Sequence, residues 1–301
     1  SAITTPAKSQ DRKLKGNISI SGAFALYPMA VKWAEEFKKI HPEVKIDISA
    51  GGAGKGMTDA LTGTADIGMI SREINPEELK KGAYPIAVTK DAVIPTMSDK
   101  NPLLDFILRK GVKQKAFTKL WITGEAKTWG KVLGVKATLP VHVYTRSDAA
   151  GAAETWAKYL GKKQEDLLGV GVFGDPGLAT AVKKDASGIG FNNIIYIYDS
   201  KTKKQANGLR AVPIDVNNNG QIDSDENFYN TLEELMQAIA DGKYPSPPAR
   251  DLYFVTKGKP TNPVVTEFLK YVLVEGQKFV HEAGYISLSK DHISTEINKV
   301  K

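Results

Sequence analysis

The first 75 residues alternate segments of strand character with segments of helical character, and this order limits the possible folds more than any other feature. The expected order is a strand at 16–21, a helix at 28–40, a strand at 44–49, a helix ending near residue 61 and a strand at 65–70. Met29, Trp33 and Phe37 recur at every fourth residue and give the first helix one apolar stripe. This β-α-β-α-β order predicts a parallel sheet covered by helices, and ligands of such sheets bind beyond the carboxyl ends of the strands.

With 301 residues the chain is long enough for two lobes, and two extended apolar segments are placed to connect them. Residues 87–96 would leave the first lobe, and residues 251–256 would return to it. We therefore expect lobe 1 to comprise residues 1–97 and 250–301, and lobe 2 to comprise residues 98–249. The predicted fold class is α/β, with a mixed, mostly parallel sheet in each lobe.

Three short segments rich in small residues lead from a strand end into a helix start, at 21–28, 50–56 and 146–154. A helix start carries unpaired main-chain N–H groups and a partial positive charge, and small residues let an anion approach both closely. A glycine before a helix is also the ordinary mark of a turn, which is the simpler interpretation of each segment alone. Together, three converging helix starts predict an anion site.

Segment 50–56 is similar in composition to the phosphate loop of nucleotide-hydrolysing enzymes, but it lacks their pattern. Ser49 stands where the first glycine belongs, and Gly56 replaces the serine or threonine that would hold magnesium. We therefore do not expect a nucleotide-hydrolysing enzyme.

Two arginines lie next to these segments. Arg146 opens the third one, where Asp148 is placed to orient its guanidinium, and Arg72 ends the segment that follows the strand at 65–70. Arginine presents a planar fork of donors that matches an oxyanion in two contacts. The alternative for either arginine is a surface or structural ion pair. Ser71 offers a hydroxyl donor, or simply caps the next turn.

Taken in order, these segments resemble the phosphate-binding proteins of ABC transporters, within the periplasmic-binding-protein superfamily. The matching pieces are residues 21–33, 51–57, 63–72, 120–129, 146–154, 174–191 and 252–256. The resemblance covers nearly the whole chain. It implies a two-lobed, type II-like fold in which two or three strands cross between the lobes and the ligand binds in the cleft.

The resemblance also implies a function without chemical conversion. The protein would be an extracytoplasmic solute-binding protein, periplasmic or at the cell surface, that captures inorganic phosphate and delivers it to an ABC permease. A monomer is expected. A binding protein that signals or adheres is an alternative that the sequence does not separate from transport.

Carried over by position, the resemblance implies a ligand site with contributions from both lobes. The implied residues are Phe24, Ala25, Ala53, Ser71, Arg72, Arg146, Asp148, Ala150, Gly151 and Ala152. The phenylalanine, the alanines and the glycine would act through their main-chain N–H groups, and Asp148 would support Arg146.

The chain departs from the family pattern at several of these positions. The family usually has serine or threonine where this chain has Phe24, Ala25, Ala53, Ala150 and Ala152. Ser71 stands where the family often has an aspartate that accepts the proton of dibasic phosphate. Each lost hydrogen bond to a charged ligand is worth roughly 1.5–3 kcal/mol. Phosphate is the first choice, and sulfate, molybdate or tungstate, or an organophosphate remains as the alternative.

Residues 215–226 match the twelve-residue calcium loop of EF-hand proteins. The ligand positions 1, 3, 5, 7, 9 and 12 are occupied by Asp215, Asn217, Asn219, Gln221, Asp223 and Glu226. Gly220 is at the sharp turn, and a helix is expected at about 232–240. The alternative is a polar turn. We predict a structural calcium ion of modest affinity, because the ligand positions carry only three carboxylates.

Composition excludes several other classes. The chain has no cysteine, which excludes disulfides, thiolate metal sites and cysteine nucleophiles, and a lipoprotein anchor would need a cysteine before Ser1. The net charge is +7, but lysines and acidic residues are interspersed, so no nucleic acid partner is expected. No run reaches the roughly 18 apolar residues of a membrane span. Residues 1–15 lack the apolar stretch of a signal peptide, so composition alone allows either a cytoplasmic protein or a mature form whose signal has been removed.

An enzyme is the main competing class. The four histidines, at positions 41, 142, 281 and 292, show no metal-ligand spacing and stand beside no plausible nucleophile. A phosphatase would need a nucleophile or a metal pair near the anion. We therefore expect no enzymatic activity and no catalytic cofactor.

Overall fold

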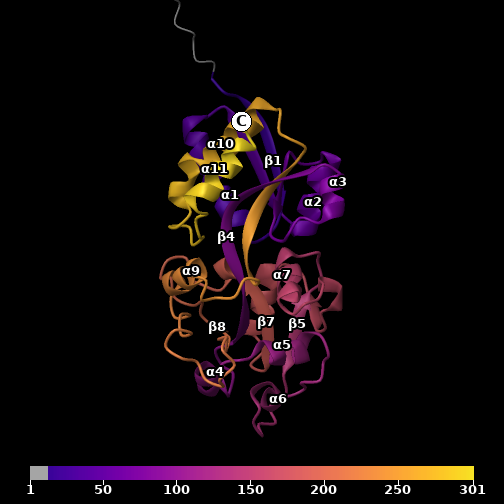
Figure 1. Cartoon of the computed structure of the whole chain (residues 1–301), viewed down its shortest axis with the longest axis vertical. Coiled ribbons are helices and arrows are strands. Elements are labelled where there is room, and N and C mark those ends of the chain that lie inside the picture. Colours follow the sequence, from indigo (N-terminus) through magenta and orange to yellow (C-terminus); the bar gives the residue numbers. More distant parts are fainter. Residues whose placement is uncertain (1–12) are drawn as a thin grey trace, which may run out of the picture.

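The structure is a computed structural model of the chain, and it describes residues 13–301. Figure 1 shows two lobes stacked along the long axis of the molecule. The strands β4 (Ala83–Ser98) and β9 (Ala249–Lys257) run from one lobe to the other. Within the described residues, no helix combines the length and apolar character that crossing a membrane requires.

Lobe 1 contains the first described elements and the end of the chain (Figure 1). Its further elements are β1 (Gly16–Gly22), α1 (Tyr27–Ile40), β2 (Val44–Ala50), α2 (Ala53–Thr62), β3 (Ile67–Ile70), α3 (Pro76–Lys80), α10 (Pro263–Leu273), η3 (Glu275–Phe279) and α11 (Lys290–Asn298). The strand order is β2-β1-β3-β9-β4, with β1 parallel to β2 and β3, and β9 antiparallel to β3 and β4.

Lobe 2 is formed by the middle of the chain together with the end of β4. Its elements are α4 (Leu104–Lys110), α5 (Gln114–Trp121), α6 (Trp129–Leu133), β5 (His142–Arg146), α7 (Gly151–Tyr159), η1 (Gln164–Asp166), β6 (Val170–Val172), α8 (Asp175–Lys183), β7 (Gly188–Asn193), η2 (Ile194–Tyr196), β8 (Leu209–Ala211) and α9 (Leu232–Ala240). The strand order is β4-β7-β5-β6, and β8 pairs with the end of β4. Strand β5 is parallel to β6 and β7, and β4 is antiparallel to β7 and β8.

The two-lobed α/β fold predicted from the sequence is confirmed, with one qualification on the sheets. Among residues 13–301, four pairs of neighbouring strands are parallel, and each of them includes β1 or β5. Four pairs are antiparallel, and each of them includes β4 or β9. The sheets are therefore mixed but not mostly parallel. The reason is that the crossing strands enter each sheet against the direction of the β-α-β units.

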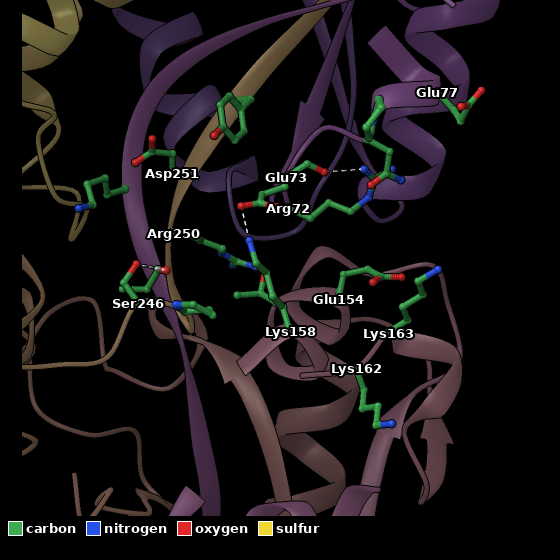
Figure 2. A pocket seen from close by; sticks show the side chains of 17 residues that line it. Arg72, Glu73, Glu77, Glu154, Lys158, Lys162, Lys163, Ser246, Arg250 and Asp251 are labelled. Atoms are coloured by element: carbon green, nitrogen blue, oxygen red, sulfur yellow. Dashed lines mark hydrogen bonds and ion pairs between the residues drawn. The ribbon is translucent and has the colours of Figure 1, made fainter. Parts of the chain in front are cut away.

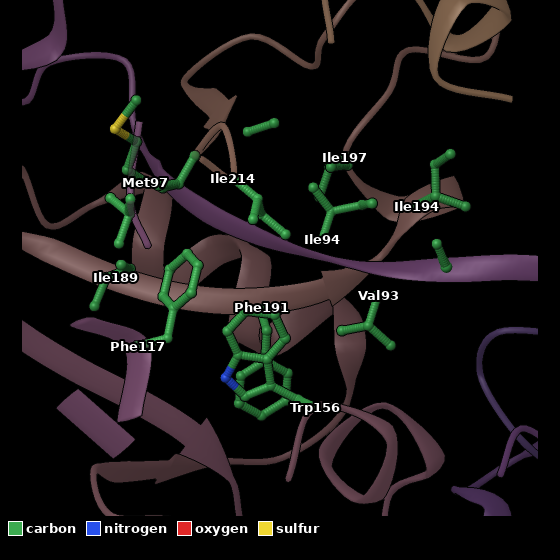
Figure 3. Close-up of a cluster of buried hydrophobic side chains, with 14 of the residues drawn as sticks. Val93, Ile94, Met97, Phe117, Trp156, Ile189, Phe191, Ile194, Ile197 and Ile214 are labelled. Atoms are coloured by element: carbon green, nitrogen blue, oxygen red, sulfur yellow. The ribbon is translucent and has the colours of Figure 1, made fainter. Parts of the chain in front are cut away.

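Each lobe has its own hydrophobic core. In lobe 1, Trp33 and Phe37 of α1 pack against Phe254 and Phe268, which confirms the predicted apolar stripe. In lobe 2, Figure 3 shows the side chains of β4 meeting Phe117, Trp156 and Phe191, and the last two rings stack at 5.9 Å. Because the large cores are separate, each lobe can move as a unit about the crossing strands.

Strand β4 changes its pairing partner along its length. Up to Ala92 it pairs with β9 in lobe 1, and from Val93 onward it pairs with β7 in lobe 2. The lobes are thus connected at the middle of one continuous strand. The lobe boundaries at 97/98 and 249/250 stay predictions.

The helical segment that follows β9 is interrupted after Leu273. Helix α10 ends at Leu273, and η3 follows it. Gly276 contacts Trp33 of α1, whose indole N–H donates a 2.8 Å hydrogen bond to the Gly276 carbonyl. This buried bond holds the chain in a turn after α10.

Candidate functional site

The start of α2 in lobe 1 faces the start of α7 in lobe 2. The N–H of Gly54 donates a 3.0 Å hydrogen bond to the carbonyl oxygen of Ala149, directly across the lobe boundary. A Cβ atom on Gly52, the residue before α2, would lie 3.1 Å from Oδ2 of Asp148. Gly52 also has a φ of 100°, which only glycine adopts readily. The lobes are therefore in contact at this point, and two helix starts meet there.

Arg146 lies buried at this contact, at the end of β5. Its Nε donates to Oδ1 of Asp148 at 2.7 Å, and its Nη2 donates to Oδ2 at 2.5 Å. The two side chains are 1% and 7% exposed. Asp148 Oδ1 also accepts the N–H of Gly174, before α8, at 3.1 Å. Asp148 thus holds the guanidinium in a fixed orientation, the supporting position that the sequence predicted for it.

Phe24, in the turn before α1, reaches across to lobe 2. The Arg146 guanidinium carbon lies 5.3 Å from the centre of its ring, and the Phe173 ring packs edge-on against it at 6.1 Å. The hydroxyl of Tyr196 donates to the Phe24 carbonyl at 2.6 Å. A cation over a ring is worth about 0.5–2 kcal/mol, more when desolvated. Phe24 therefore stabilises the contact between the lobes.

Several predicted main-chain donors have no acceptor within residues 13–301. These are the N–H groups of Phe24, Ala25, Ala53, Gly151 and Ala152. Four of these residues, Ala25, Ala53, Gly151 and Ala152, are buried. Buried main-chain N–H groups are almost always paired in proteins, so these groups are the donors that an anion would need.

Ala150 is an exception to the prediction. Its N–H already donates to Oε1 of Gln164 at 3.1 Å, and the Gln164 amide donates to the Asp148 carbonyl at 2.7 Å. The Gln164 side chain therefore occupies the donor that the sequence assigned to the anion. Gln164 lies fourteen residues further along the chain, which explains why local sequence did not reveal the contact.

Ser71 lies against Gly151 at the lobe contact. It is 2% exposed, and a Cβ on Gly151 would overlap its Oγ. The Ser71 carbonyl accepts hydrogen bonds from Arg250 Nη1 at 2.6 Å and from Thr155 Oγ1 at 3.2 Å. Ser71 is thus brought together with Gly151, and only a glycine there allows this approach.

The guanidinium of Arg72 is engaged by an acidic residue of its own lobe. Glu78 of α3 binds its guanidinium through two hydrogen bonds of 2.7 and 2.8 Å. Glu78 is held in place because it also caps the start of α3 at Asn75. Arg72 therefore forms a structural ion pair with Glu78, which was the alternative to ligand binding for this arginine.

A groove of about 760 Å³ lies beside this site, between the lobes (Figure 2). Arg72 and Glu73 of lobe 1 and Glu154 and Lys158 of lobe 2 line it, together with Arg250. An ion pair between Lys158 and Glu73 crosses it. Acidic and basic side chains are mixed in the groove, so it lacks the uniform positive charge of an anion site.

A buried polar network behind Ser71 was not predicted. Arg250 of β9 donates to Asp91 of β4 at 2.8 Å and to the amide oxygen of Asn193. Asn193 in turn donates to Asp175 at the start of α8. The network therefore connects both crossing strands with lobe 2. A usable signal was present, because Asp91 is the one acidic residue in the extended apolar segment 87–96.

The two carboxylates of this network are fully buried, and burial raises the pKa of both. Burial raises the pKa of Asp91 although the Arg250 charge opposes the shift. Burial raises the pKa of Asp175 to about 6, against the opposing charge of Arg146 and hydrogen bonds from Asn192. Asp175 therefore titrates close to neutral pH next to the buried arginine.

The predicted calcium-loop residues lie together in lobe 2, between β8 and α9. Asp215 and Glu226, at the two ends of the loop, are 1% and 5% exposed. Hydrogen bonds from Asn217 and Asn219 lower the pKa of Asp223. Helix α9, at Leu232–Ala240, follows the loop as expected.

The comparison with protein families gives a match over most of the sequence. The model of the PBP superfamily domain matches residues 7–275. The chain belongs to the PBP superfamily. Among the curated relatives of this superfamily member, the phosphate-binding protein PstS of Pseudomonas aeruginosa is 29% identical over 315 residues. The alignment covers 95% of this chain and 88% of the relative.

Solved structures show the same fold for this PBP-superfamily protein. A Clostridium perfringens protein with bound phosphate, described as a candidate substrate-binding protein of a phosphate ABC transporter, has a TM-score of 0.74 and 24% identity. The match covers 91% of this chain and 100% of that one. An ABC-type phosphate transport receptor from Vibrio cholerae has a TM-score of 0.65 and 19% identity, over 90% of this chain and all of its own.

Proposed function

We propose that this PBP-superfamily protein binds a small oxyanion between its lobes, with phosphate as the first candidate, and delivers it to an ABC permease. One observation carries the proposal. Main-chain N–H groups at helix starts of both lobes have no acceptor within residues 13–301, and these starts meet at the contact where Asp148 orients the buried Arg146. Helix starts supply both the donors and a partial positive charge that favour an anion.

The choice of phosphate is supported by the relatives. The Pseudomonas aeruginosa relative is named for phosphate binding, and the Clostridium perfringens structure contains phosphate. The choice of phosphate is weakened by the positions where alanine or phenylalanine replaces the expected hydroxyl residues, such as Ala25 and Ala53. Sulfate, molybdate or tungstate, or an organophosphate is therefore the alternative ligand.

Binding without chemical conversion fits the side chains at the site. Arg146 and Asp148 are engaged with one another, and the remaining donors around them are main-chain N–H groups and the Ser71 hydroxyl. Three of the four histidines contact carboxylates elsewhere, His142 with Asp185, His281 with Glu233 and His292 with Glu296. Within residues 13–301, the Asp148 carboxylate at the site is engaged by Arg146, and no histidine or carboxylate hydrogen-bonds the Ser71 hydroxyl to activate it. We therefore infer a binding protein and not an enzyme.

Lobe closure would couple binding to recognition by the permease. The separate cores and the shared strand β4 allow the lobes to separate, and the Gly54–Ala149 hydrogen bond forms only when they meet. An anion that contacts both lobes binds the closed form more tightly and so shifts the population toward it. The permease would then recognise the closed form of an extracytoplasmic monomer.

A panel of anions tests the ligand class. The protein is dialysed free of bound anions, and its melting temperature is measured with phosphate, sulfate, molybdate, tungstate and glycerol phosphate at equal ionic strength. We expect phosphate to raise the melting temperature most, because a ligand stabilises the form that binds it. A larger shift with another oxyanion would replace phosphate by that ion, and no shift with any of them would contradict the proposed function.

A further inference from the structure

The segment from Asp215 to Glu226 folds into a closed loop that the proposed function does not use. Asn218 and Gly220, its fourth and sixth residues, have φ angles of 60° and 84°. Calcium loops of the EF-hand type keep a glycine at the sixth position for this sharp turn. The backbone therefore has the shape that the sequence pattern predicts.

Asp215 supplies an independent observation that points to a cation. The residue is 1% exposed, and its Oδ2 accepts the N–H of Gly220 at 2.8 Å, which places the carboxylate inside the loop. Its Oδ1 is buried and has no hydrogen-bond partner among residues 13–301. A buried carboxylate oxygen without a donor is unfavourable. A cation inside the loop would satisfy it.

Further oxygen-bearing side chains meet at Asp223, where Asn217 and Asn219 are exposed. The side-chain amides of Asn217 and Asn219 lie 2.8 and 2.7 Å from Oδ2 of Asp223. A half-turn of either amide puts its oxygen where its nitrogen lies, so both can present an oxygen to an ion. Three polar side chains thus converge on one point of the loop.

Glu226 closes the loop from the other end. Its two carboxylate oxygens accept the N–H groups of Val216 at 2.7 Å and of Asp223 at 3.1 Å. These bonds fix the carboxylate across the loop, and each oxygen keeps capacity for a further contact. The twelfth residue of a calcium loop binds the ion through both carboxylate oxygens.

We propose that the loop 215–226 binds one calcium ion. The ligands are Asp215, Asn217, Asn219, Gln221 through its main-chain carbonyl, Asp223 and Glu226. Calcium accepts six to eight oxygen ligands in an irregular arrangement, whereas magnesium requires a tighter octahedral one. The loop supplies oxygen ligands from a flexible chain and therefore favours calcium.

The structure also indicates what the ion would stabilise. The N–H of Ile222 donates to the Arg109 carbonyl of α4 at 2.7 Å, and the N–H of Asp215 donates to the Val112 carbonyl at 3.0 Å. The Ile222 side chain packs on Gly111. The loop is thus attached to the last turn of α4 and to the residues that follow it. An ion that fixes the loop would also fix this part of lobe 2.

Calorimetry and thermal unfolding of the full chain test the proposal. The protein is freed of metals with a chelator and titrated with calcium chloride, with magnesium chloride as the comparison. We expect a dissociation constant of about 10⁻⁴–10⁻³ M for calcium, as in extracellular modules, and weaker binding of magnesium. Saturating calcium should raise the melting temperature by a few degrees.

Two variants locate the ion. Asp215→Asn should lose at least about tenfold in calcium affinity, because it removes a charged ligand, and with it the shift in melting temperature. Asp225→Asn is the matched control, since Asp225 is exposed and is not at a ligand position. It should bind calcium like the wild type. If Asp215→Asn fails to fold, Glu226→Gln carries the same expectation.

Two results would overturn the proposal. One is a wild-type protein that shows neither calcium binding nor a shift in melting temperature. The other is loss of binding in Asp225→Asn with binding kept in Asp215→Asn. Carboxylate oxygens of Asp223, Asp225 and Glu226 lie within 4.8 Å of one another, so the second result would place the ion on that acidic surface instead.

Discussion

The N–H of Gly54 in lobe 1 donates a 3.0 Å hydrogen bond to the carbonyl oxygen of Ala149 in lobe 2. The bond joins the start of α2 to the segment that leads into α7, and Phe24 and Ser71 make further contacts across the same boundary. The structure therefore represents a closed arrangement of the lobes. Several consequences of this closure can be measured.

Gly151→Ala should weaken closure, because a Cβ at this position would overlap Oγ of Ser71. Overpacking of this kind costs about 1–3 kcal/mol, which corresponds to a loss in anion affinity of roughly 5- to 150-fold. The measurement is phosphate affinity by calorimetry. Gly177→Ala is the control, since its Cβ would meet only Val172 within its own lobe. Equal affinity of the two variants would show that Gly151 does not limit closure.

Phe24→Ala should favour the open arrangement of the anion-free protein. The substitution removes the ring from Arg146 and Phe173, a contact worth about 0.5–2 kcal/mol. We expect a larger radius of gyration than for the wild type in small-angle X-ray scattering. An unchanged radius would mean that the ring does not hold the lobes together.

Arg250→Met should destabilise the protein by about 3–5 kcal/mol, because it leaves the buried carboxylate of Asp91 without its partner. The double variant Asp91→Asn with Arg250→Met should be less destabilised than the single effects combined. The free energies of unfolding of the wild type, the two single variants and the double variant, from thermal or chemical unfolding, give the coupling energy between the two residues. Additive effects would contradict a coupled pair.

Asp175→Asn should change how stability depends on pH. Burial raises the pKa of Asp175 to about 6 in the folded protein, above the value of about 4 in the unfolded chain. The folded state then binds the proton more tightly, so ionisation of Asp175 lowers stability as pH rises from about 4 to 6, by about 3 kcal/mol in full. Asp175→Asn has no carboxyl group to ionise, so its stability does not decrease in this way.

The stability of Asp175→Asn relative to the wild type should therefore increase between pH 4.5 and pH 7. Melting temperatures of both proteins at several pH values in this interval provide the measurement. A difference that stays constant, or that decreases with pH, would show that Asp175 ionises at its ordinary pKa.

Local pattern predicted the elements well where each signal lies within one segment. The stripe of Met29, Trp33 and Phe37 and the helix at 232–240 both appear where expected. Arg146 and Asp148 are two residues apart, so their contact was also accessible from the sequence. Such features depend on neighbours in the chain and not on how distant strands pair.

Contacts between distant segments were the part that the sequence did not reveal. Arg250 and Asp91 are 159 residues apart and meet only because β4 and β9 pair as crossing strands. Two contacts over shorter spans also escaped prediction. Gln164 of η1 accepts the N–H of Ala150, and Glu78 of α3 binds the guanidinium of Arg72, because of how these short helices fold back on the preceding segment. The antiparallel entry of the crossing strands likewise follows from the topology of the whole fold.

The most direct test of the account is a calorimetric titration of the anion-free protein with phosphate at neutral pH, on the wild type and on Arg146→Lys. Arg72→Lys is the control, because the Arg72 guanidinium is already engaged by Glu78. We predict micromolar or tighter binding by the wild type and by the control. Arg146→Lys should bind about 10- to 150-fold more weakly, since it loses about 1.5–3 kcal/mol of hydrogen bonding to a charged ligand. Wild-type protein that takes up no phosphate, or equal affinities of the wild type and Arg146→Lys, would contradict the proposed site.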